Sequence, residues 1–142
     1  MCSSDLDDSR ITSLADGARG NVRIERFVPQ AAVLDRASAV VSHGGAGTVL
    51  AAAARGIPQV ILPMTADQFD NADALADAGT ASVFLPPEVE PGAIANAINA
   101  ALGGAYDRAA AVLAAEFAAM PDADAVVRAL GDRKSTRLNS SH

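Results

Sequence analysis

The sequence is short of cysteine, lysine and aromatic residues, and each shortage limits what the protein can be. Among its 142 residues are one cysteine, no tryptophan, one tyrosine and four phenylalanines. The single cysteine, Cys2, and the single lysine, Lys134, both lie close to an end of the chain. One cysteine allows neither a disulfide framework nor a thiolate metal site. With so few aromatic side chains, the hydrophobic core must be built from Ala, Val, Leu and Ile.

Charge and hydropathy exclude two further classes of protein. The formal net charge is −6 and the isoelectric point about 4.7, whereas proteins that bind nucleic acid cluster Lys and Arg against the phosphates. No apolar run approaches the roughly 18 residues that span a bilayer, and no pattern typical of a signal peptide opens the chain. We therefore expect a cytoplasmic protein with no nucleic-acid partner and no membrane partner.

The two ends differ from the rest of the chain. Residues 1–6 (MCSSDL) and 132–142 (DRKSTRLNSSH) resemble translated sequencing-adapter DNA, the alternative being ordinary disordered termini. In either case we expect them to lie outside the fold. The length of the chain, 142 residues, predicts one domain at most, which we place at residues 7–131.

Between these ends, apolar strand patterns alternate with helical patterns. The predicted strands are Val22–Phe27, Ala39–Ser42, Gln59–Leu62 and Ala81–Leu85. The first predicted helices are Gln30–Arg36, Gly45–Arg55 and Asp67–Ala78, the last two ended by Gly56 and Gly79. Two later helical faces comprise Ile94, Ala97, Ile98, Ala101 and Leu102, and then Tyr106, Ala109, Leu113, Phe117 and Met120. Such alternation predicts an α/β fold, a Rossmann-like parallel sheet with flanking helices.

The stretch HGGAGT, residues 43–48, follows one predicted strand and opens a helix. Parallel sheets bind their ligands at the carboxyl ends of the strands. Glycines at 44, 45 and 47 let the backbone turn sharply and approach a ligand closely. The free N–H groups and the dipole of the following helix favour an anion, most naturally a phosphate. His43 and Thr48 would add a ring N–H and a hydroxyl to this site. The alternative interpretation is that the glycines are needed only for the packing of a tight turn.

The pattern excludes two familiar phosphate-binding motifs. A nucleotide-triphosphate P-loop needs a Gly-Lys-Ser/Thr run, and the only lysine lies outside residues 7–131. The dinucleotide fingerprint needs a third glycine where Leu50 stands. The residues therefore favour a diphosphate held by backbone N–H groups and His43.

Four motifs in order, FVPQAAVL, HGGAGT, GIPQVILP and ADQFDNA, resemble one family. It is the C-terminal nucleotide-sugar-binding domain of family 1 glycosyltransferases, which have the two-domain GT-B fold. The family includes bacterial antibiotic and macrolide glycosyltransferases and plant UDP-glycosyltransferases. The resemblance covers about Val22 to Ala101 and implies that residues 7–131 are an incomplete C-terminal half of a GT-B fold. In the family, two further strands precede the one that matches Val22–Phe27 in sequence, and in the sheet they lie between it and the strand that matches Ala39–Ser42. The resemblance implies that these two strands are missing here.

The resemblance also implies roles for individual residues. The donor diphosphate would contact His43, Gly44, Gly45, Ala46, Gly47 and Thr48. The nucleobase and ribose would contact Phe27, Val28 and Gln30, although Phe27 also suits a core position at a strand end. The donor sugar would contact Asp67 and Gln68, and Asn71 would lie close behind this pair. Asp67 also suits a helix N-cap.

The implied reaction transfers a sugar from a UDP- or dTDP-sugar to the hydroxyl of a small-molecule acceptor, with inversion. Many members carry, at the position of Ala51, a Glu that holds the ribose hydroxyls, so its absence favours dTDP and leaves UDP possible. No cofactor and no metal are expected, because the helix N-terminus and His43 would stabilise the leaving diphosphate. In the family, the histidine that acts as general base and the acceptor pocket belong to an N-terminal domain. We therefore expect no catalytic residue in this chain and no transferase activity from it alone.

Two other functions remain open from the sequence. One is a nucleotide-sugar 2-epimerase-like enzyme of the same architecture, which the Asp67–Gln68 pair disfavours. The other is a non-catalytic module that binds nucleotides or sugars.

Overall fold

The computed structural model describes residues 20–87 and 89–130. Contacts divide the chain into two compact units, Met1–Arg36 and Ala37–His142, and each is described by itself. The expectations for residues 1–6 and 132–142 fall outside the described residues.

The first unit contains the short helix α2, Gln30–Leu34. Pro29 precedes it in an extended conformation, and the Pro29 carbonyl accepts hydrogen bonds from the N–H groups of Ala32 and Val33 at 3.1 and 3.3 Å. A proline suits this position because it needs no hydrogen bond for a backbone N–H. The predicted helix is confirmed, although it ends two residues earlier than expected.

The prediction of a strand at Val22–Phe27 is wrong, because this segment has no regular secondary structure. A strand forms only where a neighbour satisfies its N–H and C=O groups. Among the described residues, the strands pair only with one another, in the second unit. The alternation of apolar and charged residues identifies two faces of an extended chain, but it carries no information about whether a pairing partner is present.

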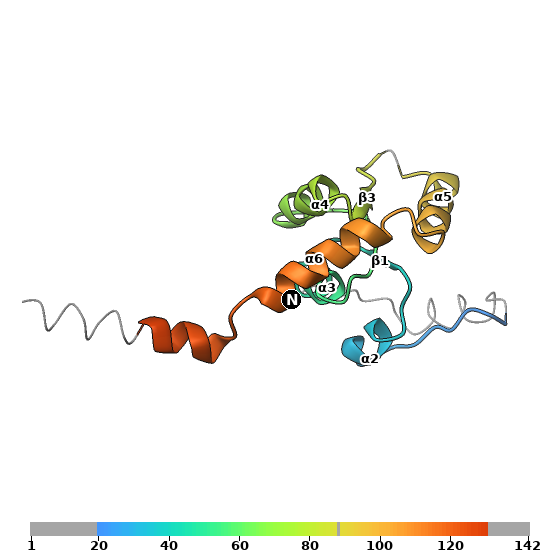
Figure 1. The fold of residues 1–142 in the computed structure, drawn as a ribbon. Coiled ribbons are helices and arrows are strands. Elements are labelled where there is room, and N and C mark those ends of the chain that lie inside the picture. Colours follow the sequence, from blue (N-terminus) through green and yellow to red (C-terminus); the bar gives the residue numbers. More distant parts are fainter. Residues whose placement is uncertain (1–19, 88, 131–142) are drawn as a thin grey trace, which may run out of the picture. The chain divides into compact units, whose positions relative to one another are not determined.

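The second unit is built on a three-stranded parallel sheet (Figure 1). Its strands are β1 (Val40–Ser42), β2 (Gln59–Ile61) and β3 (Ala81–Val83), in the order β1-β2-β3. The predicted parallel sheet is confirmed. All three residues of β2 are buried, whereas Val41 in β1 is 49% exposed. Val41 is exposed because β1 lies at the edge of the described sheet.

The longer helices are α3 (Ala46–Ala53), α4 (Gln68–Asp77), α5 (Pro91–Leu102) and α6 (Asp107–Ala119). Helices α3 and α4 connect consecutive parallel strands, which gives two βαβ units. Helix α6 lies beside α3 in Figure 1, and the two helices are in contact. Residues 123–130 are also helical.

Small aliphatic side chains form the core, as the composition predicts. The core cluster consists of Val49, Ala53, Ile61, Ala72, Leu75 and Ala81, and it receives Val83, Leu113 and Phe117 at its margin. It therefore joins α3, α4 and α6 to one face of the sheet. Because side chains alternate along a strand, Val60 points to the opposite face, and α5 contacts β2. Helices thus cover both faces of the central strand.

The ends of the helices follow their glycine signals. Gly56 and Gly79 adopt left-handed conformations, with φ of +66° and +70°, after α3 and α4. Two residues of the predicted helical faces are exposed, Leu102 by 58% and Met120 by 61%. Leu102 is the last residue of α5 and Met120 caps α6, so each lies where its helix leaves the packed layer.

Leu75 and Leu102 form a matched pair for testing this core. Replacing the buried Leu75 with alanine is expected to lower the free energy of unfolding by about 2–5 kcal/mol, because it leaves a cavity. Leu102→Ala is expected to change it by less than about 0.5 kcal/mol. Urea unfolding followed by circular dichroism measures both, and equal losses would show that α4 does not pack as described.

Candidate functional site

The turn between β1 and α3 depends on a glycine at position 44. Gly44 is left-handed, with φ +86°. A Cβ atom there would lie 2.9 Å from Cγ2 of Ile61 and 3.1 Å from the backbone oxygen of Gln68. Glycine is therefore required both by the backbone conformation and by the close approach of the turn to β2 and α4.

The N-terminus of α3 opens beside His43. Gly45 is the N-cap residue and no side chain caps the helix. Among the described residues, the N–H groups of Ala46 and Gly47 have no hydrogen-bond partner. The exposed His43 ring lies over Gly45, where an added Cβ would be 2.7 Å from its Nε2 atom. Two free N–H groups, a helix dipole and an imidazole nitrogen thus meet at one point, which is the chemistry that binds an anion.

The loop between β2 and α4 is fixed by Gln68. Its buried side chain accepts, at Oε1, hydrogen bonds from the N–H groups of Met64 and Thr65 at 2.9 and 3.1 Å. Within this loop Ala66 is left-handed, with φ +52°, a conformation that costs a residue with a Cβ about 1–2 kcal/mol. The Gln68 amide therefore holds a strained loop against the start of α4.

Asp67 directly follows this strained loop. It occupies the N-cap position of α4 but makes no capping hydrogen bond with its side chain. The alternative interpretation of Asp67 as a helix cap is therefore not supported. Its carboxylate is exposed, with Oδ2 3.5 Å from Nδ2 of Asn71.

Asn71 joins the two loops at the carboxyl edge of the sheet. Its Nδ2 atom donates a hydrogen bond to the Gly44 carbonyl at 2.9 Å. The N–H of Gly44 in turn donates to Ser42 Oγ at 3.2 Å. Two predicted segments thus lie at the ends of neighbouring strands: residues 43–48 follow β1, and residues 67–68 follow β2. The sequence marked Asn71 only as a nearby residue, and it gave no signal for Ser42 or for the conformation of Ala66.

Phe27, Val28 and Gln30 belong to the first unit. The Phe27 side chain is 83% exposed, so the alternative interpretation of Phe27 as a core residue is not supported. Val28 is also exposed, and Gln30 is the first residue of α2. Their assignment to a base and ribose site stays a prediction.

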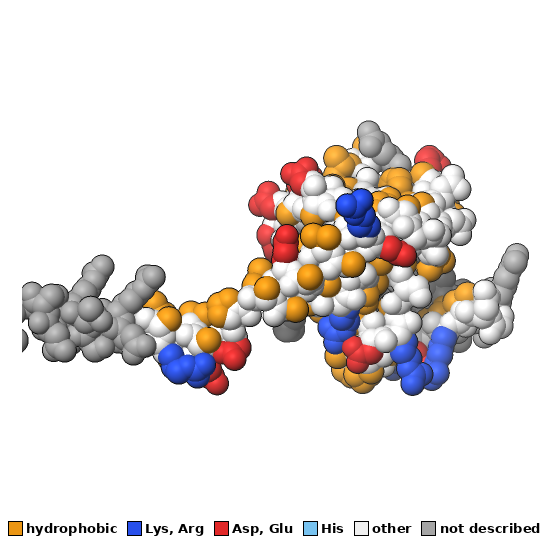
Figure 2. Space-filling model, in the orientation of Figure 1, with side chains coloured by type: hydrophobic (Ala, Val, Ile, Leu, Met, Phe, Trp, Pro, Cys, Tyr) orange, Lys and Arg blue, Asp and Glu red, His pale blue; other side chains and the backbone are white. Residues whose placement is uncertain are grey.

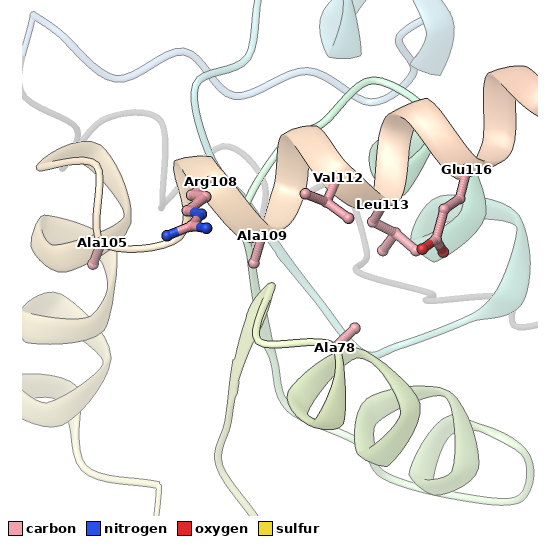
Figure 3. A pocket seen from close by; sticks show the side chains of 7 residues that line it. All are labelled: Ala78, Ala105, Arg108, Ala109, Val112, Leu113 and Glu116. Atoms are coloured by element: carbon pink, nitrogen blue, oxygen red, sulfur yellow. The ribbon is translucent and has the colours of Figure 1, made fainter.

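A pocket of about 570 Å³ lies elsewhere in the second unit, between the end of α4 and α6 (Figure 3). It is lined by Ala78, Ala105, Arg108, Ala109, Val112, Leu113 and Glu116. Figure 2 shows apolar side chains along the outer face of α6, where Val112 is exposed. None of the predicted site residues lines this pocket. Ala78 caps the C-terminal end of α4, so the pocket lies toward the amino edge of the sheet, away from His43.

Two further features are absent from the part of the chain that the structure describes. No three His, Cys, Asp or Glu side chains gather there as a group that could hold a metal ion. No helix among these residues is both long enough and apolar enough to span a membrane.

Comparison with known proteins agrees with the fold and the motifs. Residues 5–132 match the family described as erythromycin biosynthesis protein CIII-like, C-terminal domain. Tylactone mycaminosyltransferase of Streptomyces fradiae is 34% identical over 117 residues, which are 82% of this chain and 26% of that protein. Elloramycin glycosyltransferase ElmGT of Streptomyces olivaceus is 47% identical over 68 residues, 48% of this chain and 18% of that protein.

The similar solved structures are also glycosyltransferases. Glycosyltransferase VinC in complex with dTDP has a TM-score of 0.75 at 30% identity, over 81% of this chain and 29% of that chain. Spinosyn rhamnosyltransferase SpnG complexed with thymidine diphosphate has a TM-score of 0.69 at 36% identity, over 80% of this chain and 31% of that chain. The predicted α/β fold class is confirmed, and the chain spans about a third or less of each of these four relatives.

Gly44 and Gly92 form a matched pair for the backbone of the turn. Gly44→Ala is expected to lower the free energy of unfolding by about 1–3 kcal/mol, since the new Cβ meets strain and two close atoms. Gly92 lies in α5 with open space around it, so Gly92→Ala is expected to leave stability unchanged or to raise it by up to about 1 kcal/mol. Thermal unfolding compares them, and a harmless Gly44→Ala would contradict the geometry of the turn.

Proposed function

The chain belongs to the erythromycin biosynthesis protein CIII-like C-terminal domain family, and from this premise we propose that it binds the nucleotide-sugar donor of a glycosyltransferase. The observation that carries the proposal is the convergence of the open α3 N-terminus, His43 and Asp67 at one edge of the sheet. The whole enzyme would transfer a sugar from a dTDP- or UDP-sugar to the hydroxyl of a small-molecule acceptor, with inversion.

The diphosphate would bind at the glycine turn. The N–H groups of Ala46 and Gly47 and the positive end of α3 face outward there, and the exposed imidazole of His43 adds a donor. Thr48, in the first turn of the helix, would supply a hydroxyl. As the bond to the sugar breaks, the leaving diphosphate gains negative charge, and donors already in place stabilise that charge without reorganisation. This role requires no metal ion.

The donor sugar would contact the start of α4. The exposed carboxylate of Asp67 can accept hydrogen bonds from sugar hydroxyls. Because the Gln68 oxygen already holds the N–H groups of Met64 and Thr65, Gln68 would contact the sugar through its Nε2 group. Gln68 would therefore have two tasks, fixing the loop with its oxygen and binding a hydroxyl with its nitrogen.

Thymine is the base that the observations favour. Ala51 offers no carboxylate that could bind a ribose 2′-hydroxyl, and dTDP has no such hydroxyl. Two similar glycosyltransferases were solved with dTDP bound. Phe27 would stack on the base, a contact worth about 1–3 kcal/mol in other base–aromatic pairs. Val28 and Gln30 would contact the base edge and the ribose.

The acceptor and its general base would come from a part of the enzyme outside this chain. In glycosyltransferases of this type a histidine of the N-terminal domain removes the proton of the acceptor hydroxyl. The chain alone should then bind the donor and transfer no sugar. Neither a 2-epimerase nor a non-catalytic module gains support from the similar proteins, which are named as sugar transferases.

Binding of dTDP tests the diphosphate site directly. Isothermal titration of the 142-residue chain is expected to show dTDP binding that His43→Ala weakens roughly tenfold or more, because a hydrogen bond to a charged group is lost. Arg108→Ala, in the pocket between α4 and α6, is the control and should leave the affinity unchanged. The reverse pattern would move the nucleotide to that pocket and refute the proposed site.

The Asp67 carboxylate is tested by comparing two ligands. Asp67→Asn is expected to weaken binding of a dTDP-sugar about threefold to tenfold and to leave binding of dTDP unchanged, because only the sugar loses an acceptor. Asp73→Asn removes the same charge from an exposed position of the same helix and should affect neither ligand. Equal losses for both ligands would mean that Asp67 does not bind the sugar.

A further inference from the structure

The hydrogen bond from Asn71 to Gly44 connects residues that are 27 positions apart in the sequence. Asn71 is partly buried on the first turns of α4, and its amide nitrogen lies 2.9 Å from the Gly44 carbonyl oxygen. On the other side, the Gly44 N–H is held by Ser42 Oγ. Both polar groups of this one glycine are therefore fixed by side chains, one from β1 and one from α4.

This bond determines where the next N–H group points. The Gly44–Gly45 peptide bond is trans, and in a trans peptide the C=O and N–H groups point in opposite directions. With the Gly44 oxygen aimed at α4, the Gly45 N–H is aimed away from α4. Glycine has low barriers against other backbone conformations, so without Asn71 this peptide plane could rotate and turn the Gly45 N–H elsewhere.

The same amide also faces the second loop. Its nitrogen carries two hydrogens, and it lies 3.5 Å from the Asp67 carboxylate, which is a weak contact at most. Asn71 thus lies between the turn proposed to hold the diphosphate and the carboxylate proposed to hold the sugar. Aspartate at this position would have the same shape, but a carboxylate oxygen would replace the NH₂ group that faces the Gly44 carbonyl oxygen. The two oxygens would repel each other.

We propose that Asn71 is a positioning residue that sets the glycine turn in its anion-binding conformation before the ligand arrives. The inference rests on the proposed function, because it assumes that the turn receives a diphosphate. Asn71 acts through Gly44 and Gly45 and does not contact the ligand. Its removal should therefore alter the turn in the ligand-free chain as well as weaken diphosphate binding.

The test uses the ¹⁵N-labelled 142-residue chain and inorganic pyrophosphate as the probe, with dTDP as a second ligand. Asn71→Asp is compared with the wild type and with Asn96→Asp, the same substitution at an exposed position of α5. Asn71→Ala, which removes the amide without adding charge, serves if Asn71→Asp fails to fold. The readouts are the amide signals of Gly44, Gly45 and Gly47, those of β2, and the affinity for pyrophosphate.

The expected result is a shift of the Gly44 and Gly45 signals in ligand-free Asn71→Asp, unchanged β2 signals, and about tenfold weaker pyrophosphate binding. Asn96→Asp should match the wild type in all three. Wild-type behaviour of the Asn71 variant that is measured would overturn the inference. Signal changes that spread through β2 would also overturn it, because the role of Asn71 would then be structural. A wild-type chain that binds neither ligand would instead refute the proposed function, whatever the variants do to the turn.

Discussion

The close approach of Gly44 to β2 and α4 is the constraint on which the rest of the site depends. Because no side chain fits between Gly44, Ile61 and Gln68, the turn after β1 lies directly against the start of α4. That contact brings the glycine carbonyl within reach of Asn71. The N-terminus of α3 beside it is uncapped, because its N-cap residue, Gly45, has no side chain. A larger residue at position 44 would separate the two loops and divide the candidate site into halves.

Small side chains make this arrangement possible throughout the second unit. Alanine at positions 53, 72 and 81 lets α3, α4 and β3 pack closely around Ile61. The polar groups near the site are supported by the backbone, as in the two hydrogen bonds from the Met64–Thr65 loop to Gln68. The packed strands and helices therefore fix the ends of both loops, the β1–α3 turn and the β2–α4 loop. A few hydrogen bonds from Gln68 and Asn71 then hold the loops in position.

Much of the fold could be predicted because its signals are local. Gly56 and Gly79 follow the ends of α3 and α4, and the apolar run at Gln59–Leu62 forms β2. The absence of a strand at Val22–Phe27 could not be predicted from this segment. A strand needs a neighbouring strand to pair with, and the sequence of one segment does not show whether that neighbour is present. Leu102 and Met120 fit the helical period but lie at helix ends. The period of a helix does not show whether another element packs over its last residues.

The candidate site shows the same division. The sequence predicted that His43 and the glycine turn lie at a helix N-terminus, because strand, glycines and helix are contiguous. It could not predict that Asn71 would bind Gly44, that Gln68 would use its oxygen for the loop, or that Ala66 would be left-handed. These features depend on how two separate loops meet in space, and no local pattern reports that meeting.

A structure of the chain with dTDP bound tests the central claim most directly. We expect the diphosphate oxygens at about 2.7–3.1 Å from the N–H groups of Ala46 and Gly47 and from the His43 ring. We also expect the Asn71–Gly44 hydrogen bond to be unchanged from the ligand-free chain. A diphosphate bound beside Arg108, in the pocket between α4 and α6, would show that the glycine turn is not the donor site.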